Sequence, residues 1–275
     1  MNVTIAVHMI RFGPWTNSLE IWRERFQMAS PFEHVIIPHF LHEEDAKRLL
    51  EAFPSVDETW HRYENPIENK YSLNRFHGNT VIEAVFHHLQ TDSTVNVFKT
   101  LTGIHDLEAD PHLHGAGLHA YPRGGKLDIH LDYSIHPITG QERRINLLLY
   151  LNTDWDTTYG GQLQLWDEGM ESCTQTISPT FNTAVIFRTS DLSYHGLPQP
   201  LACPDGMYRR SLAIYYVSPP RPSATKRYKA EFVPLPHQPV NDSLRRLYEI
   251  RKHRLITPQD LVMWPDWKTA GHGFW

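Results

Sequence analysis

The chain has few cysteines, no long apolar run and no excess of basic residues. Cys173 and Cys203 are the two cysteines among 275 residues, so a disulfide framework is not expected and a reducing cytoplasm fits best. No run approaches the ~18 consecutive apolar residues of a membrane span, and the N-terminus lacks the basic start of a secretion signal. The formal net charge of -5 gives no general reason to expect nucleic acid or an acidic membrane as a partner. We therefore expect a soluble, cytoplasmic protein.

The overall composition is typical of a globular protein. Hydrophobic residues make up 40% of the chain and charged residues 21%, without low-complexity tracts or internal repeats. A chain of this length can bury a large core, as one domain or as two smaller ones. Apolar periodicity predicts helices over residues 17–29, 42–53, 79–89, 91–101 and 242–253, and short strands over 3–9 and 34–40. The polar segment 60–78 has no clear period and is expected to form a long ordered loop.

Short strand-like runs follow one another after Gly115 without intervening helices. They cover residues 116–121, 126–131, 143–152, 162–166, 173–177, 182–188, 193–197 and 208–218. Such a series, separated by turn signals, predicts an all-β core with flanking helices, a double-stranded β-helix of the jelly-roll or cupin type. We expect three regions. Residues 1–114 form a mixed strand and helix region that packs on the barrel, 115–218 form the jelly-roll core, and 219–275 form a C-terminal extension with helices.

His130 and Asp132 stand two apart in the run 127–132, which alternates like a strand. Residues two apart on a strand point to the same face. An imidazole and a carboxylate side by side can supply two adjacent metal ligands, and a third ligand from another strand would complete a 2-His-1-carboxylate facial triad. The chain holds 18 histidines, so a partly buried ion pair is the commoner explanation of this pair taken alone.

Two later segments supply partners for this pair. His195 follows the strongly apolar run 184–187. In the last predicted strand, alternation places Arg209 and Ser211 on the inward face and Arg210 on the face toward the helices. An arginine that projects into a barrel is costly to bury without an anion, and a carboxylate could accept hydrogen bonds from both arms of its guanidinium. Arg210 is the alternative for this role, and alternation favours Arg209.

The ordered set His130-x-Asp132, His195 and Arg209-x-Ser211 resembles the Fe(II)/2-oxoglutarate-dependent dioxygenases, most closely their prolyl-hydroxylase-like branch. The resemblance extends to Tyr121-Pro122 with the Gly-rich turn behind it, to LYLNTDW at 149–155 and to GGQLQL at 160–165, and it covers roughly residues 117–217. The chain departs from many prolyl hydroxylases at one position. They place lysine where Arg209 stands, whereas arginine is usual in the oxygen-sensing branch.

The resemblance implies a metal site, a cosubstrate and a reaction. Fe(II) would be bound by His130, Asp132 and His195, and O2 would be the oxidant. The residues implied for 2-oxoglutarate are Arg209, which would hold its distal carboxylate, and Ser211, Tyr150 and Tyr121, which would donate hydrogen bonds to it. The reaction would hydroxylate an unactivated C–H bond and release succinate and CO2. Hydroxylation is favoured over halogenation, because a carboxylate at position 132 vacates no ligand site for a halide.

Two other functional classes remain open on the sequence alone. One is a non-catalytic jelly-roll sensor module that binds a metal and 2-oxoglutarate, and the other is a zinc hydrolase, which leaves Arg209 and Ser211 unexplained. The substrate is open between a free or carrier-bound amino acid, peptidyl proline and another small polar metabolite. The charged residues of the segment 60–78 favour a small zwitterion. Nucleic acid is not expected, because no basic stripe with interleaved aromatics lies on the strands. The oligomeric state is left open.

Overall fold

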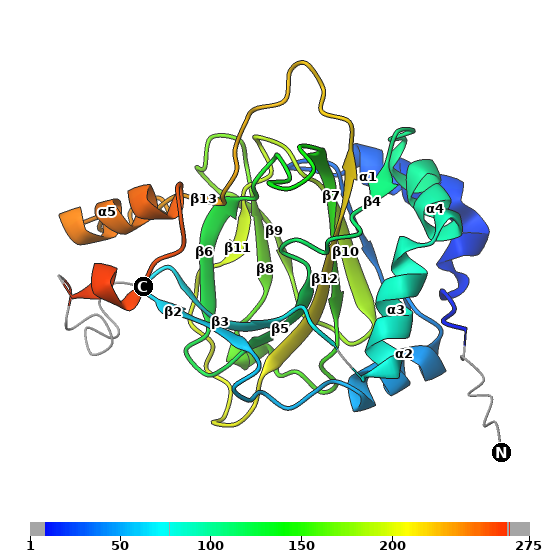
Figure 1. Cartoon of the computed structure of the whole chain (residues 1–275), viewed down its shortest axis with the longest axis horizontal. Helices are drawn as coiled ribbons and strands as arrows, with labels where there is room; N and C mark the ends of the chain where they lie inside the picture. Colours follow the sequence, from blue (N-terminus) through cyan, green and yellow to red (C-terminus); the bar gives the residue numbers. More distant parts are fainter. Residues whose placement is uncertain (1–8, 77, 263, 265–275) are drawn as a thin grey trace.

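Eight consecutive strands form a barrel at the centre of the computed structural model, which describes residues 9–76, 78–262 and 264 (Figure 1). The strands are β5 Gly117–Tyr121, β6 Lys126–Leu131, β7 Glu142–Tyr150, β8 Leu163–Trp166, β9 Cys173–Ile177, β10 Thr183–Arg188, β11 His195–Leu197 and β12 Arg209–Ser218. One half of the barrel has the order β10-β7-β12-β5 and the other half the order β6-β11-β8-β9. The pairs within both halves are antiparallel, as in a jelly roll. The predicted fold class is confirmed.

The N-terminal elements cover the outer face of the β10-β7-β12-β5 half, at the right of Figure 1. The covering helices are η1 Pro14–Ser18, α1 Leu19–Met28, α2 Glu43–Glu51, α3 Thr80–Gln90 and α4 Asp92–Thr102, and the same region contains the strand β1 His34–Ile37. β1 extends the sheet beside β10. Alternating side chains of β12 point outward into this layer, and the Tyr216 hydroxyl donates a hydrogen bond to the Leu89 carbonyl of α3 at 2.6 Å. Of the expected strand 3–9, residues 3–8 lie outside the described residues.

Local sequence signals set the ends of the two helices that pack on β12. The Asn79 side chain accepts a hydrogen bond from the backbone N–H of Ile82 and so caps the start of α3. Thr91 caps α4 through the N–H of Thr94, and Gly103, in the left-handed conformation, ends it. The apolar faces of both helices are thereby held against the outer side of the barrel.

The segment 60–78 contains a β-hairpin, so the predicted loop was wrong. β2 His61–Asn65 pairs with β3 Glu68–Leu73, and β3 also pairs with β5 and β6, where it joins the two halves of the barrel. One face of β3 carries the polar residues Glu68, Lys70 and Ser72 toward a cavity, while Tyr71 and Leu73 pack on the core. The apolar alternation is weak because the inward face of this strand borders a polar space, which is why periodicity did not reveal it.

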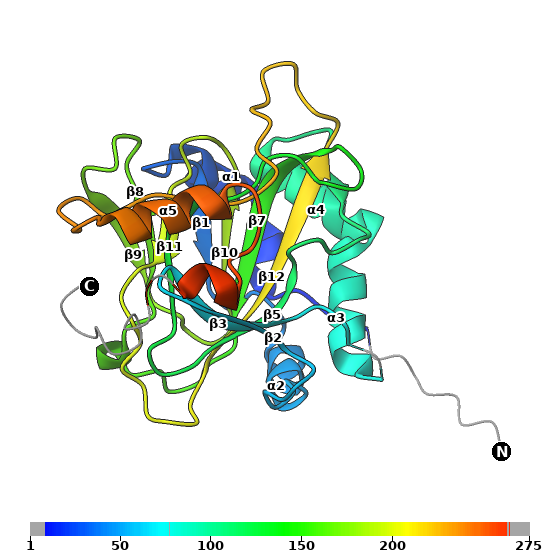
Figure 2. The ribbon, with the colours of Figure 1, turned by 60° about the vertical axis from the view of Figure 1, so that its left-hand side comes forward.

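The C-terminal extension crosses to the other side of the barrel, where α5 lies opposite the helices α1–α4 (Figures 1 and 2). β13 Glu231–Phe232 pairs with β6, and α5 Asp242–Arg251 and η3 Pro258–Leu261 follow. Two short elements complete the fold, β4 Glu108–Ala109, which pairs with β12, and η2 Thr157–Tyr159. In the described residues, none of the helices has the length and apolar character needed to cross a lipid bilayer.

Buried polar contacts fix α5 to the barrel. Arg251 Nε donates a hydrogen bond to Glu68 Oε1 of β3 at 2.9 Å, and both side chains are buried. The Tyr248 hydroxyl donates to Asp128 Oδ2 of β6 at 3.2 Å, and the Lys126 ammonium contacts the other oxygen of this carboxylate at 2.5 Å. The extension is therefore an integral part of the wall beside β6.

Candidate functional site

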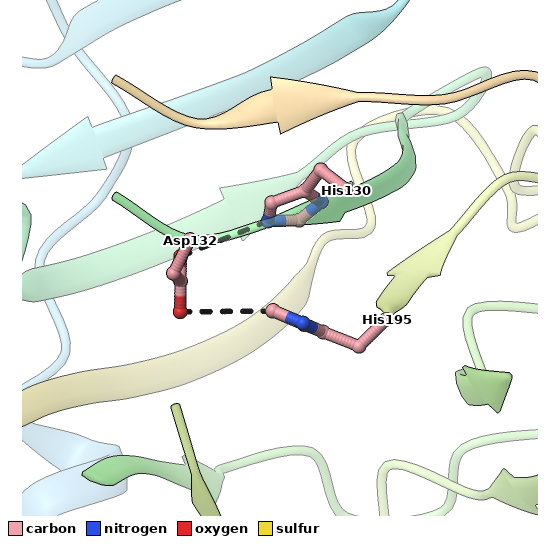
Figure 3. Close-up of side chains that lie close together, drawn as sticks. All are labelled: His130, Asp132 and His195. Atoms are coloured by element: carbon pink, nitrogen blue, oxygen red, sulfur yellow. Dashed lines mark ion pairs between the residues drawn. The ribbon is translucent and has the colours of Figure 1, made fainter. Parts of the chain in front are cut away.

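Strand pairing brings His130, Asp132 and His195 together. His195 of β11 lies directly opposite His130 of β6, and Asp132 follows two residues after His130. The candidate ligand atoms of the three buried side chains all lie within 4.8 Å of one another. The Asp132 carboxylate stands between the imidazoles, with Oδ1 3.8 Å from His130 Nε2 and Oδ2 3.8 Å from His195 Nε2 (Figure 3). In residues 9–76, 78–262 and 264, no other cluster of three His, Cys, Asp or Glu side chains is close enough to hold a metal.

Backbone carbonyl groups set the tautomers of both histidines. His130 Nδ1 lies 2.9 Å from the Asp128 carbonyl oxygen, and His195 Nδ1 lies 2.8 Å from the Ser193 carbonyl oxygen. A carbonyl oxygen only accepts hydrogen bonds, so each Nδ1 carries a proton and each Nε2 is the ring nitrogen that faces Asp132. Burial lowers the pKa of His130 to about 3, which keeps this imidazole neutral near pH 7. Neutral imidazoles with this second hydrogen bond are the form in which histidine binds metals.

The third group, Asp132, is held as a carboxylate by its neighbours. Burial by itself would raise its pKa, but His195 and Arg143 nearby, together with a hydrogen bond from Asn146, lower the pKa below its ordinary value. Asn146 Nδ2 donates that bond to Oδ2 at 3.0 Å. Two imidazoles and one carboxylate on rigid strands make a donor set that suits Fe(II), with further ligand positions left for other molecules.

Arg143 is a site residue that the sequence reasoning missed. Its buried guanidinium lies between the rings of Tyr133 and Tyr215, with Cζ 3.3 Å and 3.2 Å from their centroids. Nη1 lies 3.7 Å from Asp132 Oδ1, and Nη2 donates to the His114 carbonyl at 2.8 Å. The sequence of β7 could have indicated this residue, because burying an arginine and the nearby Asn146 in a strand costs free energy unless both side chains face a polar site.

A second cluster forms where β12 lies between β5 and β7. In the strand registers, Arg209 lies opposite Tyr121 of β5, and Ser211 lies opposite Tyr150 of β7. The Arg209 Cζ atom is 4.8 Å from the Tyr150 ring centroid and 5.3 Å from that of Tyr121. Arg209 Nε donates to the Gly161 carbonyl at 2.7 Å. Gly161 has φ +79°, and a Cβ there would stand 2.9 Å from Arg209 Cδ, so glycine leaves the space that the arginine occupies.

Two groups in this cluster lack the partners that their burial calls for. Among the described residues, no carboxylate lies within ion-pair distance of the buried Arg209 guanidinium, and the buried Tyr150 hydroxyl lies beside that guanidinium without a well-formed hydrogen bond. A carboxylate supplied by a ligand would satisfy both groups, so the residues present fit 2-oxoglutarate. Arg210 lies on the opposite face with its Cζ 5.5 Å from the Phe53 ring centroid, as alternation predicted.

One cavity of about 320 Å³ connects the two clusters. The candidate residues that line it are His130, Asp132, His195, Arg209, Ser211 and Tyr121. Tyr150 lies deeper, in the apolar barrel interior with Val185 and Phe187. His119 of β5 is a further wall residue that the sequence reasoning missed, and burial lowers its pKa well below the ordinary value. His112 and His114 lie in the turn before β5, where both backbone N–H groups donate to Asp110, and His114 also lines the cavity.

Comparisons with known proteins agree with this arrangement. Residues 116–217 match the family model of the 2OG-Fe(II) oxygenase superfamily. No curated protein matches the chain in sequence. Among solved structures, a Pseudomonas putida prolyl-4-hydroxylase is similar with a TM-score of 0.52 and 19% identity, over 73% of this chain and 100% of the other. A Phytophthora capsici prolyl 4-hydroxylase is similar with a TM-score of 0.54 and 20% identity, over 88% of this chain and 77% of the other.

A third similar structure is that of a prolyl hydroxylase from Trichoplax adhaerens in complex with a peptide fragment of hypoxia inducible factor. It has a TM-score of 0.52 and 16% identity, over 75% of this chain and 94% of the other. At these identities the solved structures show a shared fold, while the match to the family model covers the strands that carry both clusters. Residues 116–217 therefore match the model of the 2OG-Fe(II) oxygenase superfamily, and the barrel has the fold of the prolyl hydroxylases.

Proposed function

We propose that the chain is an Fe(II)- and 2-oxoglutarate-dependent hydroxylase. His130, Asp132 and His195 hold the metal. The cosubstrate residues are Arg209, Ser211, Tyr121 and Tyr150. The reaction hydroxylates an unactivated C–H bond of an amino-acid-like substrate, either a free or carrier-bound amino acid or a peptidyl proline, and releases succinate and CO2. Cys173 and Cys203 are free thiols, which supports our placement of the protein in the cytoplasm.

One observation carries this proposal. A single cavity joins a metal donor set to a buried arginine that has no carboxylate partner among the described residues. A structural metal site or a zinc hydrolase has no use for Arg209, whose burial costs free energy until an anion pairs with it. The dicarboxylate 2-oxoglutarate supplies that anion and, at its other end, ligands for the metal. A non-catalytic sensor would use the same contacts, so turnover is the property to test.

Different residues of the chain orient the metal ligands and the cosubstrate. When bound, Fe(II) and 2-oxoglutarate supply the oxidising chemistry that inserts one oxygen atom of O2 into a C–H bond. The carbonyl groups of Asp128 and Ser193 orient the two imidazoles, and Asn146 fixes the carboxylate of Asp132. The fork of Arg209 binds the distal carboxylate of the cosubstrate in one orientation. Burial of all these groups keeps bulk water from competing for them.

The decisive experiment is succinate release by protein purified without oxygen and loaded with Fe(II). Free amino acids and proline peptides are screened for stimulation, with His195→Ala and Arg209→Ala as inactive controls. Stimulated succinate release supports a hydroxylase. Metal-dependent 2-oxoglutarate binding without succinate release from any substrate would support the sensor instead, and Zn(II)-dependent hydrolysis would support the hydrolase.

A further inference from the structure

The wall of the cavity carries more positive than negative charge. Five cationic side chains line it, namely Lys70, Arg143, Arg209, Lys229 and Arg251, against two acidic ones, Glu68 and Asp132. Arg251 is paired with Glu68, and Arg143 stands beside Asp132. In the proposed function, Arg209 binds the distal carboxylate of 2-oxoglutarate. The charges of Fe(II) and of the 2-oxoglutarate dianion cancel, so binding both leaves the surplus of positive charge unchanged.

Lys70 is one of the two cavity cations that belong neither to these two ion pairs nor to the proposed cosubstrate site. It lies half-buried on the inward face of β3, with Nζ 5.1 Å from the ring centroid of Tyr63. Burial, and to a smaller extent the charge of Lys70, lowers the pKa of His119, which places the ammonium group near the interior of the cavity. No carboxylate of the described chain lies within ion-pair distance of Lys70.

Lys229 is the second such cation and comes from a different element. It lies half-buried in the segment between β12 and β13. Burial, Arg143 and, less strongly, Lys229 lower the pKa of His114, which lines the same cavity. In the part of the chain that the structure describes, Lys229 also lacks a carboxylate within ion-pair distance. Neither lysine belongs to the segment 116–217, so this surplus is a property of the elements that surround the barrel.

Half-buried lysines in a concave wall differ from lysines on an open surface. Water solvates them less completely, so an anion that enters the cavity gains more from their charge. The cavity of about 320 Å³ is also at the small end of the ~300–1,000 Å³ that ligand sites span, and 2-oxoglutarate fills part of it. The remaining space suits a small molecule, and the remaining charge suits an acid. An internal prolyl residue of a peptide offers no negative charge to either lysine.

We propose that the substrate is a small molecule with a free carboxylate, which Lys70 and Lys229 bind in the cavity. This inference rests on the proposed function and narrows its substrate class. Peptidyl proline is the competing class, and it makes the opposite prediction about the dependence of binding on a free acid group.

The test measures binding without turnover. The full chain, loaded with Mn(II) and 2-oxoglutarate in the absence of oxygen, is titrated in a calorimeter with matched acids and amides. The probes are L-proline and L-prolinamide, L-glutamate and L-glutamine, L-aspartate and L-asparagine, and N-acetyl-L-prolinamide as a mimic of an internal prolyl residue. At least one acid is expected to bind on the order of tenfold more tightly than its amide, because hydrogen bonds between charged groups are the strong ones.

Variants then assign the effect to the two lysines. Lys70→Met and Lys229→Met are each expected to weaken binding of that acid by about tenfold and to leave binding of its amide nearly unchanged, while Lys70→Arg retains most of the affinity. Lys226→Met is the matched control, because this exposed lysine lies in the same segment as Lys229 but does not line the cavity.

The binding of 2-oxoglutarate to the wild-type protein, measured first, separates the two possible failures. Absence of metal-dependent 2-oxoglutarate binding means that the proposed function itself fails. If 2-oxoglutarate binds but no acid is preferred over its amide, or the preferred acid binds both methionine variants as well as the wild type, the inference about the substrate is overturned and the proposed function stands.

Discussion

The ring of Phe232 stacks on the imidazole of His130, with the ring centroids 5.0 Å apart and an angle of 28° between the planes. Phe232 lies opposite His130 in the pairing of β13 with β6. In the same segment Arg227 Nε donates a hydrogen bond to the Asp132 carbonyl at 2.7 Å. Two of the three candidate metal ligands are therefore supported by a segment that lies beyond the residues matched by the oxygenase family.

Replacing Phe232 with alanine is expected to weaken metal binding. The change uncovers one face of His130 and lets the imidazole move, and loss of a group that orients a ligand costs ~10–100-fold in metal affinity. We expect a loss near the lower end, about tenfold, in titrations with Mn(II). Phe232→Leu keeps apolar cover and should lose less. An unchanged Mn(II) affinity in Phe232→Ala would show that β13 does not orient the ligand.

The variants His130→Ala, Asp132→Ala and His195→Ala are each expected to abolish Fe(II)-dependent succinate release. Their stabilities should differ. Asp132→Ala leaves the buried Arg143 without the carboxylate 3.7 Å away, and removing one partner of a buried charge pair is destabilising. The histidine variants should melt close to the wild type when all proteins are metal-free. If chelation instead unfolds the wild type itself, the metal is structural rather than catalytic.

Arg209→Ala is expected to weaken 2-oxoglutarate binding by two to three orders of magnitude. Truncating one partner of a buried ion pair costs ~3–5 kcal/mol, at ~1.4 kcal/mol for each tenfold change. Arg209→Lys should recover part of the loss, because lysine restores the charge without the two-armed fork. Arg210→Ala is the control, since this side chain packs near Phe53 outside the cavity. The measurement is the 2-oxoglutarate concentration that gives half-maximal turnover. If this concentration rises more in Arg210→Ala than in Arg209→Ala, Arg209 is not the residue that binds the distal carboxylate.

Metal-free protein is expected to lose stability in mild acid, in part through His130. Burial lowers the pKa of this imidazole from its ordinary 6.5 to about 3. Between these values the unfolded chain binds a proton that the folded chain does not, so the free energy of unfolding rises with pH by up to about 1.4 kcal/mol per pH unit. The contribution is fully present above about pH 6.5 and is lost as the pH falls toward about 3.

Urea unfolding with a chelator present, at several pH values in this window, measures the effect. His130→Asn should reduce the slope of the unfolding free energy against pH by the contribution of one histidine. His87→Asn, an exposed histidine on α3, should leave the slope unchanged. Equal slopes for wild type and His130→Asn would mean that His130 is not held neutral by burial.

Arg251→Ala is expected to destabilise the protein by about 3–5 kcal/mol, because it leaves the Glu68 carboxylate buried without its partner. The double variant Arg251→Met with Glu68→Gln should recover most of this loss, since no uncompensated charge remains. Arg245→Ala on the same helix is the control, because its exposed pair with Asp242 contributes roughly 0–1 kcal/mol. Thermal melting compares the four proteins, and equal losses in Arg251→Ala and Arg245→Ala would contradict an integral role for α5.

Alternation was enough to predict the barrel and the faces of its strands. The runs from 116 to 218 are short and bounded by glycine and proline turns, and all eight form strands. On β12 the strict period of two placed Arg209 and Ser211 in the interior and Arg210 outside, as the structure has them. The same rule paired His130 with Asp132, because neighbours on one face of a strand need no knowledge of the rest of the fold.

The strand register, the hairpin and the cavity wall required the tertiary structure. His195 meets His130 only through the pairing of β11 with β6, and no local pattern encodes which residues of two distant strands lie opposite. The hairpin at 61–73 was missed because its inward face lines a polar cavity, which removes the apolar period that marks a half-buried strand.

Alternation along single strands was therefore sufficient to predict the barrel, the faces of its strands and the pair His130 and Asp132, since these depend on the chemistry of neighbours along one strand. The tertiary structure decided which distant side chains share the cavity. It placed Arg143 beside Asp132, Phe232 over His130 and the two lysines in the wall. Such contacts arise from long-range packing and charge compensation, which local periodicity does not record.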